Sequence, residues 1–116
     1  MKTSELTGVD LDWAVGMALG HDMSKAINLG AYLRIPAHTG SAYTVTFCPS
    51  TDWTLGGSII ERDKLGLMHV ISGGASYWVS TGYLAEECGP TPLVAAMRCF
   101  VAGKLGDDVT VRDGVV

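Results

Sequence analysis

One stretch near the C-terminus decides the fold: Gly89-Pro90-Thr91-Pro92-Leu93-Val94-Ala95-Ala96-Met97-Arg98-Cys99-Phe100-Val101-Ala102-Gly103-Lys104-Leu105-Gly106. It predicts a helix that begins after Thr91, because the hydroxyl can accept a free N–H of the first turn and Pro92 has a suitable φ angle. Lys104 suits the negative end of the helix dipole, and Gly106 can adopt the left-handed conformation that ends a helix. The apolar side chains recur at steps of three and four residues: Leu93, Val94, Met97, Phe100, Val101 and Leu105. We therefore expect this helix to be the hydrophobic centre of the fold.

The N-terminal part of the chain carries a second helix pattern. Thr7 and Asp10 have the spacing of a capping box, with Asp10 in the place of the usual glutamate. Gly20 can end the helix, and a polar link at residues 21–25 follows it. Between these ends the apolar residues follow helical spacing: Leu11, Ala14, Val15 and Ala18.

The remaining apolar runs are short and alternate with polar residues, which is typical of strands. Residues 29–35 and 43–47 flank a turn and predict a β-hairpin. Residues 76–80 and 109–111 predict two further strands.

The middle of the chain leaves alternatives open. Residues 49–57 combine turn formers, a tryptophan and two glycines, and predict a loop. Residues 58–62 fit either a short strand or the first turn of a helix, and residues 65–71 are equally ambiguous. Residues 86–89 are expected to connect to the C-terminal helix. The whole pattern predicts a single α+β domain over residues 1–116, with a mostly antiparallel sheet of four or five strands and two helices packed against it.

Composition excludes several classes of protein. An apolar fraction of 47% and a charged fraction of 17% describe a globular chain rather than a disordered one. A net charge of −4 argues against general nucleic-acid binding, which needs a basic face. The chain has no signal-peptide pattern and no apolar run near the roughly 20 residues that span a bilayer, so we expect a cytoplasmic protein without membrane contact. The apolar surplus favours a homo-oligomer.

No motif points to catalysis, a metal or a cofactor. The three cysteines lack the spacing of a zinc or redox site, and the three histidines are scattered. The serines form no nucleophile elbow, and the glycine pairs form no phosphate-binding loop. We therefore assign no catalytic residue, no metal ligand and no cofactor.

The candidate site is the loop around Trp53. We expect Trp13 and Trp78 in the core, but Trp53 lies among polar turn formers, where an exposed aromatic ring can stack on a base. Arg62 and Arg98 are either surface ion-pair partners or forks that bind a phosphate. The predicted ligand-binding residues are Thr51, Asp52, Trp53, Arg62 and Arg98.

Three blocks of the chain resemble the phage NinX family. They are Thr3-Ser4-Glu5-Leu6-Thr7-Gly8 with residues 11–15, then Pro49-Ser50-Thr51-Asp52-Trp53 with residues 56–57 and 59–62, and finally Gly89-Pro90-Thr91-Pro92-Leu93 with residues 96–98 and 104–107. The resemblance implies a small accessory protein of a tailed phage or prophage, acting in the bacterial host cell. It implies no activity and no catalytic residues.

Three functions from different classes fit the sequence. The first is a non-catalytic protein that binds and sequesters a host nucleotide signal, which would be a counter-defence role. The second is a protein-interaction module that inhibits a host or phage enzyme. The third is a small hydrolase that uses Asp52 or Glu61.

Overall fold

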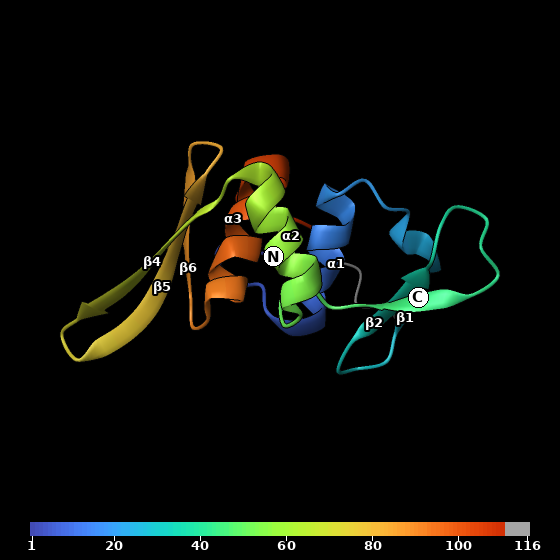
Figure 1. The fold of residues 1–116 in the computed structure, drawn as a ribbon, viewed down its shortest axis with the longest axis horizontal. Helices are drawn as coiled ribbons and strands as arrows, with labels where there is room; N and C mark the ends of the chain where they lie inside the picture. The colour runs from blue at the N-terminus through green and yellow to red at the C-terminus, as the bar shows by residue number, and fades with distance from the viewer. Residues whose placement is uncertain (111–116) are drawn as a thin grey trace.

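The computed structural model describes residues 1–110. Over this range the chain forms three α-helices, flanked by two separate three-stranded antiparallel sheets. Figure 1 shows the helices in the middle of an elongated molecule with a sheet at each end, and the molecule measures 48 × 27 × 22 Å. The elements are η1 (Thr3–Glu5), α1 (Gly8–Ala18), η2 (Met23–Lys25), β1 (Ile27–Asn28), β2 (Leu33–Pro36), β3 (Thr44–Phe47), α2 (Trp53–Asp63), β4 (Gly66–Ser72), β5 (Ala75–Gly82), β6 (Ala85–Gly89) and α3 (Pro92–Leu105). The predicted α+β class is confirmed, but one sheet with two helices is wrong.

Helix α3 forms as the sequence predicts and is the centre of the core. Thr91 Oγ1 accepts the N–H of Val94 at 3.1 Å, and Pro92 is the first helical residue. The helix is buried on almost every side rather than along one stripe, whereas Leu105 at its end is 39% exposed. Gly106 ends the helix with φ 94° and ψ −171°, which is a positive φ but not the left-handed helical conformation that was expected.

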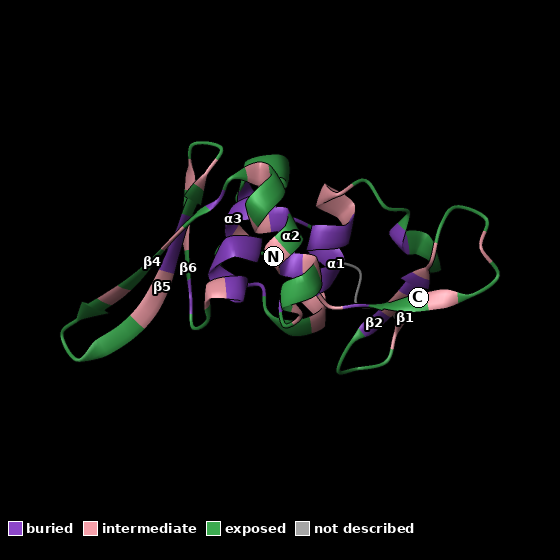
Figure 2. Ribbon diagram, in the orientation of Figure 1, coloured by how far each residue is buried: buried purple, intermediate pink, exposed green. Residues whose placement is uncertain are grey.

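The neighbours of α3 explain this burial. It contacts β4, β5 and β6 on one side and α1 and α2 on the other. Figure 2 shows buried residues concentrated in α3 and α1, and exposed residues at the far ends of both sheets. The largest fully buried side chains include Leu6, Leu11, Val15, Met97, Phe100 and Val101. A helix that is apolar all round is stable only inside such a core.

Helix α1 also forms as predicted, but its start differs. Thr7 is the residue before the helix, yet its side chain makes no capping hydrogen bond. Gly8 has φ +57°, so the chain enters the helix through a conformation that favours glycine. The predicted stripe is confirmed, because Leu11, Ala14 and Val15 are fully buried.

The predicted loop at residues 49–57 is wrong in its second half, because α2 begins at Trp53. Asp52 Oδ1 accepts the N–H of Thr54 at 2.8 Å and caps the helix. The two glycines are helical. A Cβ on Gly56 would lie only 2.4 Å from the carbonyl oxygen of Pro49, so glycine is required here for close packing rather than for a turn. Of the two alternatives for residues 58–62, the helix is correct, but these residues form its later turns rather than its first turn.

The first sheet contains the predicted hairpin. Strand β2 pairs with β3 in the register Leu33↔Phe47 to Pro36↔Thr44, and β1 adds two residues at the edge. The strand predicted at 29–35 begins only at Leu33. The Arg34 side chain reaches across to Thr44 and Thr46, which ties the two long strands together.

The second sheet comes from the ambiguous part of the sequence. Residues 65–71 correspond to β4, and the strand predicted at 76–80 is confirmed as part of β5. Residues 86–89 were predicted as a connection but belong to β6, which pairs with β5 and packs against α3. Helix α2 separates β3 from β4 along the chain, and the strands on its two sides never meet.

The ends of the described chain lie together. Thr3 Oγ1 donates to the carbonyl of Gly106 at 2.7 Å, and the N-terminal amine contacts Asp108 at 2.9 Å. Lys2 and Asp108 form an isolated β-bridge, whereas Val109 and Thr110 form no strand. The remainder of the strand predicted at 109–111 lies outside the described residues.

None of the helices within residues 1–110 has the length and apolarity to cross a bilayer.

Candidate functional site

Three of the predicted site residues lie at the start of α2. Thr51 is exposed, Asp52 caps the helix through its bond to Thr54, and Trp53 is 55% exposed. The prediction that Trp53 is exposed is confirmed. Trp13 is buried as predicted, but Trp78 is only half-buried, with its ring centre 4.9 Å from that of His69.

Arg62 lies in the last turn of the same helix. Its Nε and Nη2 donate to Asp63 Oδ2 at 3.2 and 2.8 Å, and this hydrogen bonding raises the pKa of Arg62. Its guanidinium carbon lies 6.0 Å from the centre of the Phe100 ring. Trp53 and Arg62 are nine positions apart, about two and a half helical turns, so they lie on opposite sides of α2.

Arg98 lies on α3 and holds two other segments in place. Its Nε donates to the carbonyl of Leu6 and its Nη1 to the carbonyl of Cys88, both at 2.8 Å. Burial lowers the pKa of Arg98. The five predicted residues therefore occupy three separate places: both ends of α2, and the contact of α3 with η1 and β6. Their ligand-binding roles stay predictions.

The structure has a groove that includes Arg62 but not Trp53 or Arg98. We call it the hairpin groove. Its larger part, about 860 Å³, lies between the segment from Gly20 to Lys25, the β2–β3 hairpin and Leu55 of α2. A smaller part of about 280 Å³ continues along α2 past Ser58 to Arg62. The two parts share His21, Phe47 and Leu55.

Local interactions place the groove residues. Gly20, with φ +87°, turns the chain at the end of α1, and the His21 N–H donates to the carbonyl of Gly16 at 3.0 Å. The His21 ring then meets Phe47 edge to face, with ring centres 5.7 Å apart. Asp22 Oδ1 accepts from the Ser24 N–H and hydroxyl at 3.0 and 2.6 Å, which starts η2.

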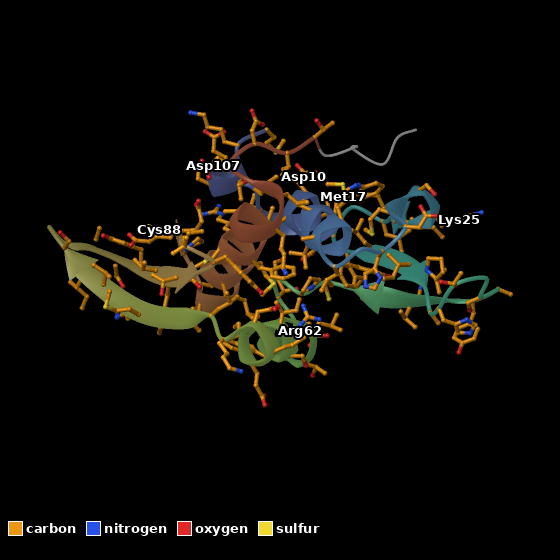
Figure 3. The ribbon with its side chains drawn as sticks, turned by 90° about the horizontal axis from the view of Figure 1, so that it is seen from above. Asp10, Met17, Lys25, Arg62, Cys88 and Asp107 are labelled. Carbon is orange, nitrogen blue, oxygen red and sulfur yellow. The ribbon has the colours of Figure 1, made fainter. Side chains whose placement is uncertain are left out.

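The groove combines an apolar floor with basic and imidazole groups. Phe47 and Leu55 lie on the floor, and Lys25, His38 and Arg62 lie along its length. Figure 3 labels Lys25 on η2 and Arg62 on α2. Asp22 also lines the groove, and its bonds to Ser24 lower its pKa, so it is charged at neutral pH. Such a surface can hold a planar ring on the floor and an anion beside the basic groups.

Sequence reasoning missed His21, Lys25 and His38. The first two lie in the segment that was predicted as a polar link, and His38 lies in the predicted hairpin turn. No local spacing relates them, because the hairpin brings the two segments together across the chain. Three histidines in a chain of 116 residues were the only signal, and they were assigned no role.

Comparison with known proteins identifies a family. The family model described as bacteriophage P22, NinX matches residues 2–104. No functionally curated protein matches the chain. The match covers most of the chain, including the first two blocks on which the resemblance was based and the third block up to residue 104. The resemblance is therefore confirmed, and the chain belongs to the bacteriophage P22 NinX family of phage accessory proteins.

Proposed function

We propose that this phage accessory protein is a non-catalytic binding protein that sequesters a host nucleotide signal in the hairpin groove. The observation that carries the proposal is the groove itself: an apolar floor with Phe47, two histidines and Lys25 line a volume of about 860 Å³, and Arg62 lines the adjoining part of about 280 Å³. Small-molecule sites usually occupy about 300–1,000 Å³ and combine apolar walls with a few placed polar groups. Phe47 lines both parts of the groove, so a base beside it has Lys25 of the larger part and Arg62 of the smaller part as candidate contacts for its phosphate.

The free protein has donors available for such a ligand. Arg62 uses Nε and Nη2 for Asp63, while Nη1 makes no hydrogen bond with the described residues. A charge-assisted bond from an arginine contributes about 1.5–3 kcal/mol, and stacking adds about 1–3 kcal/mol per base. The net charge of −4 opposes the binding of an anionic ligand only weakly, because charges beyond about 8 Å are screened at physiological salt.

The hydrolase alternative has less support. Asp52 uses its carboxylate to cap α2, and Glu61 is exposed on the same helix. Neither residue lines the hairpin groove. A binding protein would return its ligand unchanged when it is denatured, whereas a hydrolase would return products.

Calorimetric titration with nucleotides, including cyclic dinucleotides, tests the proposal. Arg62→Gln is expected to weaken binding roughly 10- to 150-fold, the equivalent of one charge-assisted bond. Trp53→Ala is the matched control, because Trp53 is exposed on the opposite side of α2 and should not affect the groove. Absence of micromolar nucleotide binding by the wild type would overturn the proposal, as would an Arg62→Gln variant that binds equally well.

A second candidate is a protein-interaction module that inhibits a host or phage enzyme. Its support is the β5–β6 turn, where Tyr83 and Leu84 have φ +53° and +61°, a conformation that usually takes asparagine and glycine. Tyr83 packs on Gly103 of α3, and Leu84 is fully exposed. Backbone strain of this kind clusters at binding sites. Loss of a co-purifying enzyme on Leu84→Ser, with nucleotide binding absent, would favour this second function.

A further inference from the structure

Strand β4 is a free edge of the second sheet, in which the strand order is β4-β5-β6. It runs for seven residues from Gly66 to Ser72 and carries no lysine, arginine or carboxylate. Met68 is 60% exposed and Ile71 is 74% exposed. In Figure 1 the β4–β5 hairpin projects away from the helices, and Figure 2 shows that its tip is exposed. A long, uncharged, apolar edge strand has unpaired backbone groups that can pair with a strand of another chain.

The hairpin turn determines which backbone groups face this free edge. Gly73 and Gly74 form a two-residue turn with positive φ, and Ser72 pairs with Ala75 to close it. The closing pair of such a turn is hydrogen-bonded, and hydrogen-bonded pairs then alternate along the ladder. The N–H and C=O groups of the alternate residues therefore point outward: Leu67, His69 and Ile71.

The other sheet edges of the described chain are protected against pairing with a strand of another molecule. Strand β6 carries Glu86 and Glu87, and its Cys88 carbonyl accepts a hydrogen bond from Arg98. On β3, the Thr44 carbonyl accepts from Arg34 Nη2 at 2.6 Å. Strand β1 has only two residues. Short length and charge are common devices against edge pairing, and β4 has neither.

We propose that two copies of the chain pair their β4 strands antiparallel about a two-fold axis at His69, forming one continuous six-stranded sheet. His69 is the middle residue of β4, so this register pairs the full length of both strands. His69 of one copy then faces His69 of the second copy, Leu67 faces Ile71, and Met68 faces Val70. All outward backbone groups of β4 find partners, and the same patch is used on both copies, as a two-fold interface requires.

The chemistry of the strand favours a second copy as the occupant. Each chain has a net charge of −4, but β4 brings no formal charge to the contact, and the two glutamates of this sheet lie on its other edge. Met68 and Ile71, on opposite faces of the sheet, each lose part of their solvent exposure when the strands pair. An interface of one strand pair is at the small end of specific contacts, so the dimer should be reversible. The inference does not depend on the hairpin groove.

Sedimentation velocity over a range of about 1–100 µM tests the dimer, because a reversible dimer forms by mass action as the protein concentration rises. The wild type is expected to shift from monomer to dimer as its concentration rises. His69→Glu and His69→Lys should each stay monomeric, because two like charges would face each other at the axis. A mixture of these two variants should form a heterodimer. Leu84→Glu and Leu84→Lys are matched controls that make the same charge changes away from the edge, and each should dimerise like the wild type.

Each result bears on the proposal. A wild type that stays monomeric throughout the range would overturn it. Dimers of both His69 variants would place the contact elsewhere. A mixture that stays monomeric would exclude the register centred on His69, since only that register sets the two variant residues opposite each other. The His69 ring is exposed but contacts Trp78 and hydrogen-bonds Ser76 of β5, so circular dichroism of each variant is compared with the wild type to show that the hairpin stays folded.

Discussion

Gly56 is a residue of α2 that packs closely against the rest of the molecule. A Cβ there would lie 2.4 Å from the carbonyl oxygen of Pro49 and 2.6 Å from Leu93 Cδ2. The neighbouring Gly57 has more room, because a Cβ there would lie 3.6 Å from Trp53 Cε3, an ordinary contact. The two glycines look alike in the sequence, and only packing distinguishes them.

This difference gives the first prediction. Gly56→Ala should lower the free energy of unfolding by about 1–3 kcal/mol, the usual cost of overpacking. Gly57→Ala should raise it by about 0.5–1 kcal/mol, because alanine is the better helix former. Urea unfolding of both variants measures the two changes. Equal effects would mean that α2 does not approach Pro49 as described.

Asp12 is a buried carboxyl in the middle of α1. It is 2% exposed and accepts the N–H of Ser50 at 2.8 Å. Burial raises its pKa from 3.8 to about 6, against the opposing effect of the Ser50 hydrogen bond. The folded protein thus holds this proton more tightly than the unfolded chain. The contribution of this bound proton to the free energy of unfolding is complete below pH 3.8 and is lost as the pH rises through about 6.

The second prediction uses Asp12→Asn, which keeps the shape and an acceptor oxygen but does not titrate. Relative to the wild type, the variant should gain about 2 kcal/mol of unfolding free energy between pH 4 and pH 7. Urea unfolding at both pH values measures this gain. If the variant and the wild type differ in unfolding free energy by the same amount at both pH values, the pKa of Asp12 is not raised.

At the scale of elements, local signals predicted α3 well and α2 poorly. Thr91, Pro92 and a long apolar run determine α3, and its cap forms as expected. For α2, two glycines and a run of turn formers pointed to a loop, because both weaken a helix in isolation. Tertiary contact outweighs that preference: Ile59 is 5% exposed in the core, and the Asp52 cap secures the first turn.

The third prediction concerns α3. Met97 is fully buried, so Met97→Ala should lower the free energy of unfolding by roughly 2–5 kcal/mol through the cavity it leaves. Met68→Ala makes the same chemical change at a side chain that is 60% exposed, and should cost no more than about 0.5 kcal/mol. Thermal unfolding at submicromolar concentration compares them. Similar losses would show that α3 is not the centre of the core.

The fourth prediction separates two roles for Arg98. Its bonds to the Leu6 and Cys88 carbonyls join the residue after η1, and strand β6, to α3. Arg98→Gln should therefore lower the free energy of unfolding by about 1.5–3 kcal/mol and leave nucleotide affinity unchanged. Unfolding and titration of the same sample measure both quantities. Weaker binding without a loss of stability would instead support the phosphate-binding role predicted from the sequence.

At the scale of the molecule, the sequence predicted the class but not the arrangement. The strand patterns at residues 43–47 and 76–80 are correct, since such alternation is local. Whether strands share a sheet depends on contacts across the chain, and α2 lies between β3 and β4. The candidate site also depends on contacts between segments that are far apart in the sequence. Exposure of Trp53 follows from its polar neighbours, but the hairpin groove exists only because residues 20–25 fold against a hairpin further along the chain.

The central claim is that the hairpin groove binds a nucleotide, and amide chemical-shift mapping tests it most directly. In the fifth prediction, titration of a labelled sample with a cyclic dinucleotide moves the amide signals of residues 20–25, 35–47 and 55–62, which line or adjoin the groove. Signals of β4 and β5 should stay unchanged at a fixed protein concentration, because these strands lie at the other end of the molecule. Shifts confined to those strands, or no shifts at a saturating concentration, would contradict the account.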